Sequence, residues 1–178
     1  MVKPLDAEKF EAIFHCYKNM VYRLAYLTLG DAQEAEDVMQ EVFIKVYQAH
    51  DSFRPEKGNF NSWLRRITIN QSISRQRRKS LPSLSLENLE EEGADLSETS
   101  YELPEETAIK QEESRRIQRA ISFLDKKHRA ILALRYFDNL SYNEISLVLE
   151  IPLGTVKSRI NTAIKALRRE MVDKEVSP

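Results

Sequence analysis

The sequence predicts an all-α protein with two small helical domains joined by a flexible acidic linker, the C-terminal domain carrying a helix-turn-helix. Three observations support this fold class. Apolar residues recur at helical spacing in both halves, the middle segment lacks such spacing, and two short capped helices follow each other near the C-terminus. The 178 residues suffice for two domains of about 80 and 65 residues, each with a modest helical core.

Two helices are predicted at the start of the N-terminal domain. The first runs from Phe10 to Leu29 and stops at Gly30, and Asp31 opens the second. The second has one apolar face, made of Ala35, Val38, Met39, Val42, Phe43 and Val46. Its other side carries Glu34, Asp37, Gln40 and Glu41. This acidic side is either a solvated face, favourable near a helix N-terminus, or a docking surface for a basic partner helix.

A third helix is predicted after a loop of turn-forming residues from Asp51 to Asn59. Aromatic residues at the start of this helix are interleaved with arginines, a pattern that can stack unpaired bases and hold their phosphates. Core packing is the commoner role of a residue such as Trp63. The predicted inward stripe is Trp63, Ile67, Asn70 and Ser74, with Leu64 and Ile73 beside it; the rest of the helix surface carries Arg65, Arg66, Arg75, Arg77, Arg78 and Lys79. Asn70 would then need hydrogen-bond partners, which suggests that it fixes the loop.

Charge is distributed unevenly along the chain. Residues 1–80 hold 13 Lys or Arg and 10 Asp or Glu, residues 81–113 hold 1 and 11, and residues 114–178 hold 13 and 7. Two basic folded parts therefore flank an acidic strip rich in Ser, Glu and Pro. We expect this strip to be an extended linker, acting either as a solvated tether or as an anionic strand lying in a basic channel of a partner.

The segment SYNEISLVLEIPLGTVKSRI, residues 141–160, predicts two helices joined by a tight turn. Ser141 and Glu144 form a capping box, and Thr155 is expected to cap the second helix after Pro152-Leu153-Gly154. The inward residues are Ile145, Val148 and Leu149, then Val156, Ile160, Ala163 and Leu167; the outward ones are Lys157, Ser158, Asn161, Thr162, Lys165, Arg168 and Arg169. Short polar side chains followed by cations are typical of a DNA recognition helix. The alternative is an ordinary helical hairpin with a solvated basic face.

Several classes are disfavoured by composition. Cys16 is the sole cysteine, so no intramolecular disulfide or cysteine-based zinc cluster can form, which suits a reducing cytosol. His15, His50 and His128 are scattered, and no metal-ligand spacing or Gly-rich phosphate loop is present. We therefore expect no enzyme, such as a serine recombinase, no catalytic residue, no metal and no cofactor. No apolar run reaches membrane-spanning length and no signal-peptide core is present, so a cytoplasmic protein is expected.

Taken together, these segments resemble the extracytoplasmic-function sigma factors of bacterial RNA polymerase. The resemblance rests on AEDVMQEVFIKVYQAHDSFRPEKGNFNSWLRRI, on FLDKKHRAILALRYFDNLSYNEI and on IPLGTVKSRI, in that order around the acidic linker. It implies an N-terminal domain, residues 1–80, that binds the polymerase clamp and melts the downstream promoter element. Residues 81–113 would be the linker, and residues 114–178 a domain that reads the upstream element and touches the polymerase flap.

The resemblance also assigns roles to residues. Polymerase binding is expected at Asp37, Gln40 and Glu41. DNA binding is expected at Arg54, Phe60, Trp63 and Arg66, which would open the strands and capture a flipped base, and at Lys157, Ser158, Arg159 and Thr162, which would read duplex DNA. The implied partners are core RNA polymerase, promoter DNA and an anti-sigma factor, without direct membrane insertion of this chain.

The chain departs from the family pattern at four positions. Ser74 stands where Asp is common, Thr162 and Ile164 stand where Arg is common, and Glu150 occupies a turn position that is often Gly. A positive φ at Glu150 would add strain of about 1 kcal/mol. The competing interpretation is a conventional helix-turn-helix regulator with an N-terminal sensing or dimerisation domain, which would bind its operator without polymerase.

Overall fold

The computed structural model describes residues 6–49, 59–79, 117 and 119–172, and every regular element in them is helical. These elements are α1 (Ala7–Leu29), α2 (Ala32–Ala49), α3 (Phe60–Lys79), α5 (Lys126–Leu132), the π-helical turn η3 (Ala133–Phe137), α6 (Tyr142–Leu149) and α7 (Leu153–Val172). The all-α prediction is confirmed. The predicted loop at residues 51–58 and the predicted linker at residues 81–113 lie outside the described residues.

Helix α1 ends and α2 opens where the sequence predicts, whereas α1 begins at Ala7, three residues before the predicted start at Phe10. Gly30 has φ 77° and donates its N–H to the Tyr26 carbonyl at 2.7 Å, which ends α1. The Asp31 carboxylate accepts the Glu34 N–H at 2.8 Å and opens α2. The predicted apolar face of α2 is buried, with Val38, Val42 and Val46 fully covered by α1 and α3.

The predicted inward stripe of α3 is only partly correct. Asn70 and Ser74 are exposed, whereas Leu64, Thr68, Ile69, Gln71 and Ser72 are buried. The polar residues tolerate burial because the hydroxyl of Thr68 donates to the Leu64 carbonyl at 2.9 Å and that of Ser72 to the Thr68 carbonyl at 2.9 Å. The expected role of Asn70 as a buried residue that fixes the loop is therefore wrong.

The predicted helix-turn-helix is formed by α6 and α7. Both hydrogen bonds of the Ser141 and Glu144 capping box are present, and α6 ends at Glu150 with φ 53° and ψ 43°. The expected cap at Thr155 is wrong, because α7 already begins at Leu153. The Pro152 carbonyl accepts the N–H groups of Thr155 and Val156, at 2.8 and 3.1 Å, so the helix begins three residues earlier than a cap at Thr155 would place it.

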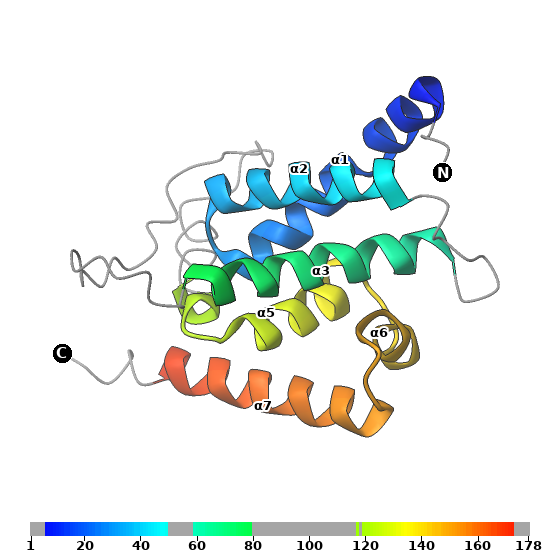
Figure 1. Cartoon of the computed structure of the whole chain (residues 1–178). Helices are drawn as coiled ribbons and strands as arrows, with labels where there is room; N and C mark the ends of the chain where they lie inside the picture. The colour runs from blue at the N-terminus through cyan, green and yellow to red at the C-terminus, as the bar shows by residue number, and fades with distance from the viewer. Residues whose placement is uncertain (1–5, 50–58, 80–116, 118, 173–178) are drawn as a thin grey trace, which may run out of the picture.

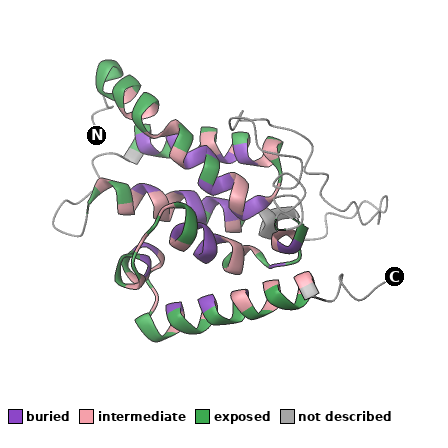
Figure 2. Cartoon of the chain, turned by 180° about the vertical axis from the view of Figure 1, so that it is seen from behind, coloured by how far each residue is buried: buried purple, intermediate pink, exposed green. Residues whose placement is uncertain are grey.

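The helices form two units that share a core. We call α1, α2 and α3 the first unit, and residues 119–172 the second unit. Helix α2 lies on one side of the molecule and α7 on the opposite side, with α3 and α5 between them (Figure 1). Leu24 and Ile69 of the first unit belong to one apolar cluster with Ala130, Ile131 and Leu134 of the second. Buried residues accordingly face inward from both units (Figure 2), so the two halves pack against each other as well as internally.

Candidate protein and nucleic-acid interfaces

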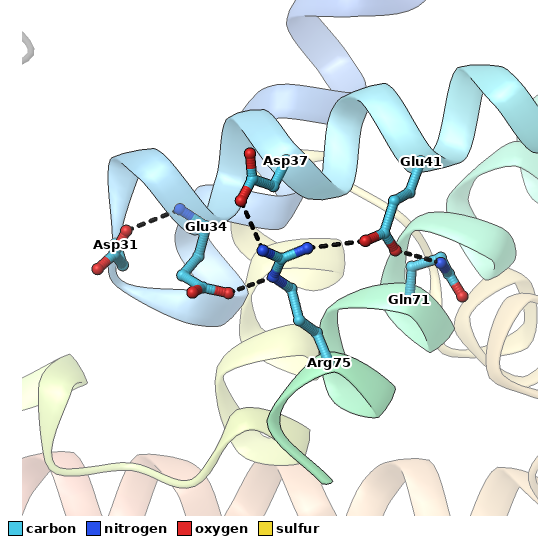
Figure 3. A network of polar contacts seen from close by, with 6 residues as sticks. All are labelled: Asp31, Glu34, Asp37, Glu41, Gln71 and Arg75. Atoms are coloured by element: carbon cyan, nitrogen blue, oxygen red, sulfur yellow. Dashed lines mark hydrogen bonds and ion pairs between the residues drawn. The ribbon is translucent and has the colours of Figure 1, made fainter. Parts of the chain in front are cut away.

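The acidic side of α2 holds a guanidinium group (Figure 3). Arg75, from the last turns of α3, bonds to three carboxylates of α2: Nε to Glu34, Nη2 to Asp37 at 2.5 Å and Nη1 to Glu41 at 2.7 Å. The hydrogen bond to Glu34, followed by the negative charges of Glu34, Asp37 and Glu41, raises the pKa of Arg75 despite its partial burial. This network fastens α2 to α3.

The network continues through a buried amide. The second oxygen of Glu41 accepts from Gln71 Nε2 at 2.7 Å, and Gln71 Oε1 accepts from Lys45 Nζ at 2.5 Å. Both oxygens of Glu41 are thus engaged within the chain. Asp37 uses one oxygen, and Gln40 is exposed. The three expected polymerase-binding residues therefore share one side of α2, but they are available to a partner to different degrees.

An aromatic group stands at the start of α3. The Phe60 ring lies 5.3 Å from that of Tyr17 and 5.5 Å from that of Trp63, centroid to centroid. All three side chains are half-buried against the core of the first unit, so Trp63 packs inside and also reaches the surface. Arg54, the remaining expected DNA contact of this region, lies outside the described residues. The structure thus brings Phe60 and Trp63 together, beside the segment expected to hold the melting loop.

The outward face of α7 is basic and open. Lys157, Ser158, Asn161, Thr162, Lys165, Arg168 and Arg169 are all exposed, and Arg159 is half-buried. In the part of the chain that the structure describes, no carboxylate pairs with Lys157, Lys165 or Arg168. The opposite face of α7 is core, where Val156, Ile160 and Ala163 are fully buried. This confirms the predicted amphipathic pattern of the helix.

Polar contacts between the described residues also join the two units, and sequence reasoning missed them. Arg65 Nε donates to Asp138 Oδ2 at 2.6 Å, Arg66 pairs with Glu150, and Arg129 Nη1 donates to the Leu29 carbonyl at 2.9 Å. Glu150 has a positive φ of 53°, the condition under which strain is expected from the sequence, and Asn139, next to Asp138, has φ 54°. The unusual Glu at the turn was the one available signal, although its distant partner could not be predicted from spacing.

Comparison with known proteins identifies both units. The family Sigma-70 region 2 matches residues 13–81 and the family Sigma-70, region 4 matches residues 120–169. The chain is 39% identical over 176 residues to the ECF RNA polymerase sigma factor SigW of Bacillus subtilis, which covers 97% of this chain and 94% of that protein. The chain belongs to the extracytoplasmic-function sigma factors. It is also 36% identical over 182 residues to the ECF RNA polymerase sigma-E factor of Escherichia coli K12, which covers 97% of this chain and 89% of that protein.

Solved structures of sigma factors share this fold. The sigma factor RpoE of Bartonella quintana, solved in complex with the anti-sigma factor NepR, aligns with a TM-score of 0.68 at 18% identity, covering 97% of this chain and all of that one. CnrH in complex with the cytosolic domain of CnrY aligns with a TM-score of 0.63 at 20% identity, covering 97% and 92%. The extracytoplasmic-function sigma factors are DNA-binding transcription initiation factors, so this chain is a sigma factor of the alternative type. The conventional helix-turn-helix regulator is not favoured.

Among the described residues, no helix is both long and apolar enough to cross a membrane. Nor do their His, Cys, Asp and Glu residues form a group of three or more that could hold a metal ion.

Proposed function

We propose that this sigma factor binds core RNA polymerase through the acidic side of α2 and directs initiation through two separate DNA surfaces, without a catalytic step of its own. The observation that carries the proposal is the open face of α7, which presents short polar side chains near its start and exposed cations farther along the same helix. Such an order suits a helix whose N-terminal part meets base edges while cations farther along meet phosphates.

The three residues of the proposed docking surface on α2 differ in how much of each side chain a partner could contact. Gln40 is exposed and Asp37 keeps one carboxylate oxygen outside the Arg75 contact, so these two residues would meet the polymerase clamp directly. Both carboxylate oxygens of Glu41 accept hydrogen bonds within the chain, from Arg75 and Gln71. Glu41 would therefore support polymerase binding both by direct contact and by holding α2 in position on α3. A basic partner is expected, because three carboxylates and one guanidinium leave this side with net negative charge.

The two DNA surfaces would act on different forms of the promoter. Lys157, Ser158, Arg159 and Thr162 would read the upstream element as duplex. Phe60, Trp63 and Arg66, with Arg54, would hold the downstream element once its strands separate, because a base can stack on aromatic rings only after it leaves the helix. The half-buried rings of Phe60 and Trp63 support this division, since each offers an edge beside the core.

An anti-sigma factor is a further proposed partner. Support comes from the related folds, two of which were solved with an anti-sigma factor or a cytosolic partner domain bound. The division into residues 1–80, 81–113 and 114–178 is part of the same proposal and agrees with the family matches on either side of the linker. Because core RNA polymerase is the proposed partner, we also propose a cytoplasmic location.

Run-off transcription on a promoter library tests this function. Core polymerase with the chain should produce transcripts from a small set of promoters, and core polymerase alone should not. The Asp37→Lys variant serves as a control that should lose these transcripts while remaining helical by circular dichroism. Equal promoter-specific transcription with and without the protein would refute the proposal, and specific duplex binding by the chain alone at full affinity would favour the conventional regulator instead.

A further inference from the structure

The guanidinium of Arg75 is held by three carboxylates of α2. Its Nε donates to Glu34, its Nη2 to Asp37 at 2.5 Å and its Nη1 to Glu41 at 2.7 Å (Figure 3). The three acidic residues recur at i, i+3 and i+7, so they lie along one side of the helix. A guanidinium is a rigid planar fork, which suits acceptors fixed in this way better than a flexible ammonium does. Arg75 is therefore fixed against α2 through both ends of its guanidinium.

The three carboxylates differ in what they leave for a partner. The side chain of Glu34 is 19% exposed, whereas that of Asp37 is 36% exposed. Asp37 gives Oδ2 to Arg75, and its other oxygen points away from Arg75 (Figure 3). Gln40, one turn farther along α2, is exposed as well. Glu34 thus serves as an inner anchor for the guanidinium, while Asp37 keeps an acceptor for a group outside the chain.

Glu41 is fixed from two sides by α3. Its Oε1 accepts from Arg75, and its Oε2 accepts at 2.7 Å from the amide of Gln71, a buried residue one turn earlier in α3. Displacing Arg75 would break charge-assisted hydrogen bonds to three carboxylates and leave a partly buried cation without them, which is costly. A basic group of a partner would therefore bind beside Arg75 rather than in its place.

We propose that Arg75 is a positioning residue for polymerase binding, which stays in place in the complex and holds Asp37 so that its second oxygen, beside Gln40, meets a basic group of the polymerase. The proposal rests on the proposed function, because it concerns the docking side of α2. One guanidinium then has two opposite effects. Its charge weakens the attraction of α2 for a basic partner and slows association, whereas its geometry keeps Asp37 ordered before binding and slows dissociation.

Rate constants separate the two effects. Association and dissociation of the full-length chain are measured on immobilised core RNA polymerase at several ionic strengths. Arg75→Ala should associate about two- to threefold faster than wild type at low salt, and this gain should vanish at high salt, where charges are screened. It should dissociate about tenfold faster at every salt concentration. Arg75→Lys keeps the charge but loses the fork, so it should associate like wild type and still dissociate about three- to tenfold faster.

Two controls exclude a merely structural role. Arg23→Ala makes the same change of charge as Arg75→Ala at an exposed position of α1 and should leave dissociation unchanged. A variant that only unfolds more readily would bind less protein at saturation but would keep the wild-type dissociation rate, because only folded chains bind. If Arg75 acts through Asp37, Arg75→Lys should change dissociation by less than about twofold in an Asp37→Asn background. In a Glu36→Gln background its full effect should remain.

Two outcomes overturn the inference. Arg75→Lys could dissociate from polymerase at the wild-type rate, which would mean that the three-way contact does not support the complex. Alternatively, its effect could be equal in the Asp37→Asn and Glu36→Gln backgrounds, which would mean that Arg75 does not act through Asp37. Failure of the proposed docking surface gives a different result, because Asp37→Lys would then bind polymerase as well as Glu36→Lys does. Arg75→Lys decides the question even if Arg75→Ala does not fold.

Discussion

Helices α3 and α7 carry most of the expected DNA contacts, yet their cations are in opposite states. On α3, Arg65, Arg66 and Arg75 each pair with carboxylates from other helices or turns. On α7, Lys157 has no carboxylate partner among the described residues. A basic helix in the sequence is therefore not the same as a basic surface in the fold.

The difference separates three roles for positive charge. Arg75 fastens helices inside the first unit, Arg65 and Arg66 join the two units, and the cations of α7 remain available to phosphates. Phosphate binding depends on cations that can release counterions, so we expect the exposed cations of α7 to bind duplex DNA more readily than the paired arginines of α3. Substitutions of Arg75 and Lys157 test this division directly, and substitutions of Asp37 and Glu144 give the largest and the smallest expected effects for comparison.

Charge reversal on α2 should have the largest effect. Asp37→Lys should weaken binding to core polymerase by about 2–3 kcal/mol, since it places a cation where a basic partner is expected. The matched control is Glu36→Lys, an equal charge change at an exposed position of the same helix. Binding is measured by titration of labelled polymerase, and folding by the helical spectrum. Equal affinities of the two variants would contradict the docking role.

The second-largest effect should be a loss of folding stability when the guanidinium of Arg75 is removed. Arg75→Ala leaves Glu34, Asp37 and Glu41 facing one another, and because Arg75 is only 23% exposed we expect the free energy of unfolding to fall by about 1–2 kcal/mol. Arg75→Lys keeps the charge but not the contact with all three carboxylates, so its free energy of unfolding should lie between those of wild type and Arg75→Ala. Urea unfolding measures both, with Arg66→Ala as the control that loses an open pair. If Arg75→Ala is as stable as that control, the network is not structural.

The open cations of α7 should give a smaller, salt-dependent effect. Lys157→Ala should weaken binding to an upstream-element duplex by about 1 kcal/mol and, if its contact is to phosphate, reduce the salt slope by about one unit. Lys127→Ala, an exposed lysine of α5, is the charge-matched control. Arg66→Ala should not affect duplex binding. An unchanged slope together with unchanged affinity in Lys157→Ala would remove α7 from the duplex interface.

The smallest effect should come from the capping box of α6. The hydroxyl and the N–H of Ser141 donate to the Glu144 carboxylate at 2.6 and 2.7 Å. These two hydrogen bonds, and the hydroxyl bond most of all, lower the pKa of Glu144 from its ordinary 4.5. A lowered folded-state pKa means that the stabilisation is present above 4.5 and is lost as the pH falls through the folded-state value. The stability difference between wild type and Glu144→Gln should therefore shrink in acid. A stability difference between wild type and Glu144→Gln that stays constant across the acidic range would show that the ionised carboxylate is not the source of the stabilisation.

Local patterns predicted the helices and their caps well, but they missed polar residues that are buried in the core. The end of α1 at Gly30 and the capping box at Ser141 follow from residues three or four positions apart, so the sequence contains them directly. The burial of Thr68 and Ser72 was missed because each hydroxyl satisfies itself on its own helix, which hides a polar residue in the core.

The site was predictable only in part. Asp37, Gln40 and Glu41 were placed on one side of α2 by periodicity, and the exposed face of α7 followed in the same way. The pairing of Arg75 with α2 joins residues 34 to 41 positions apart, and no local rule selects it from the other arginines of α3. The roles of these residues in binding polymerase and DNA stay predictions.

The contact between Gly30 and Arg129 links the two halves in a different sense. A Cβ at residue 30 would lie 2.7 Å from Arg129 Nη1, and that guanidinium caps α1 through the Leu29 carbonyl. Burial lowers the pKa of Arg129, so this group is held away from water by both halves at once. Together with the shared cluster around Leu24 and Ile69, this contact leads us to expect that the two described units melt in one cooperative transition, and that a side chain introduced at residue 30 would destabilise both units.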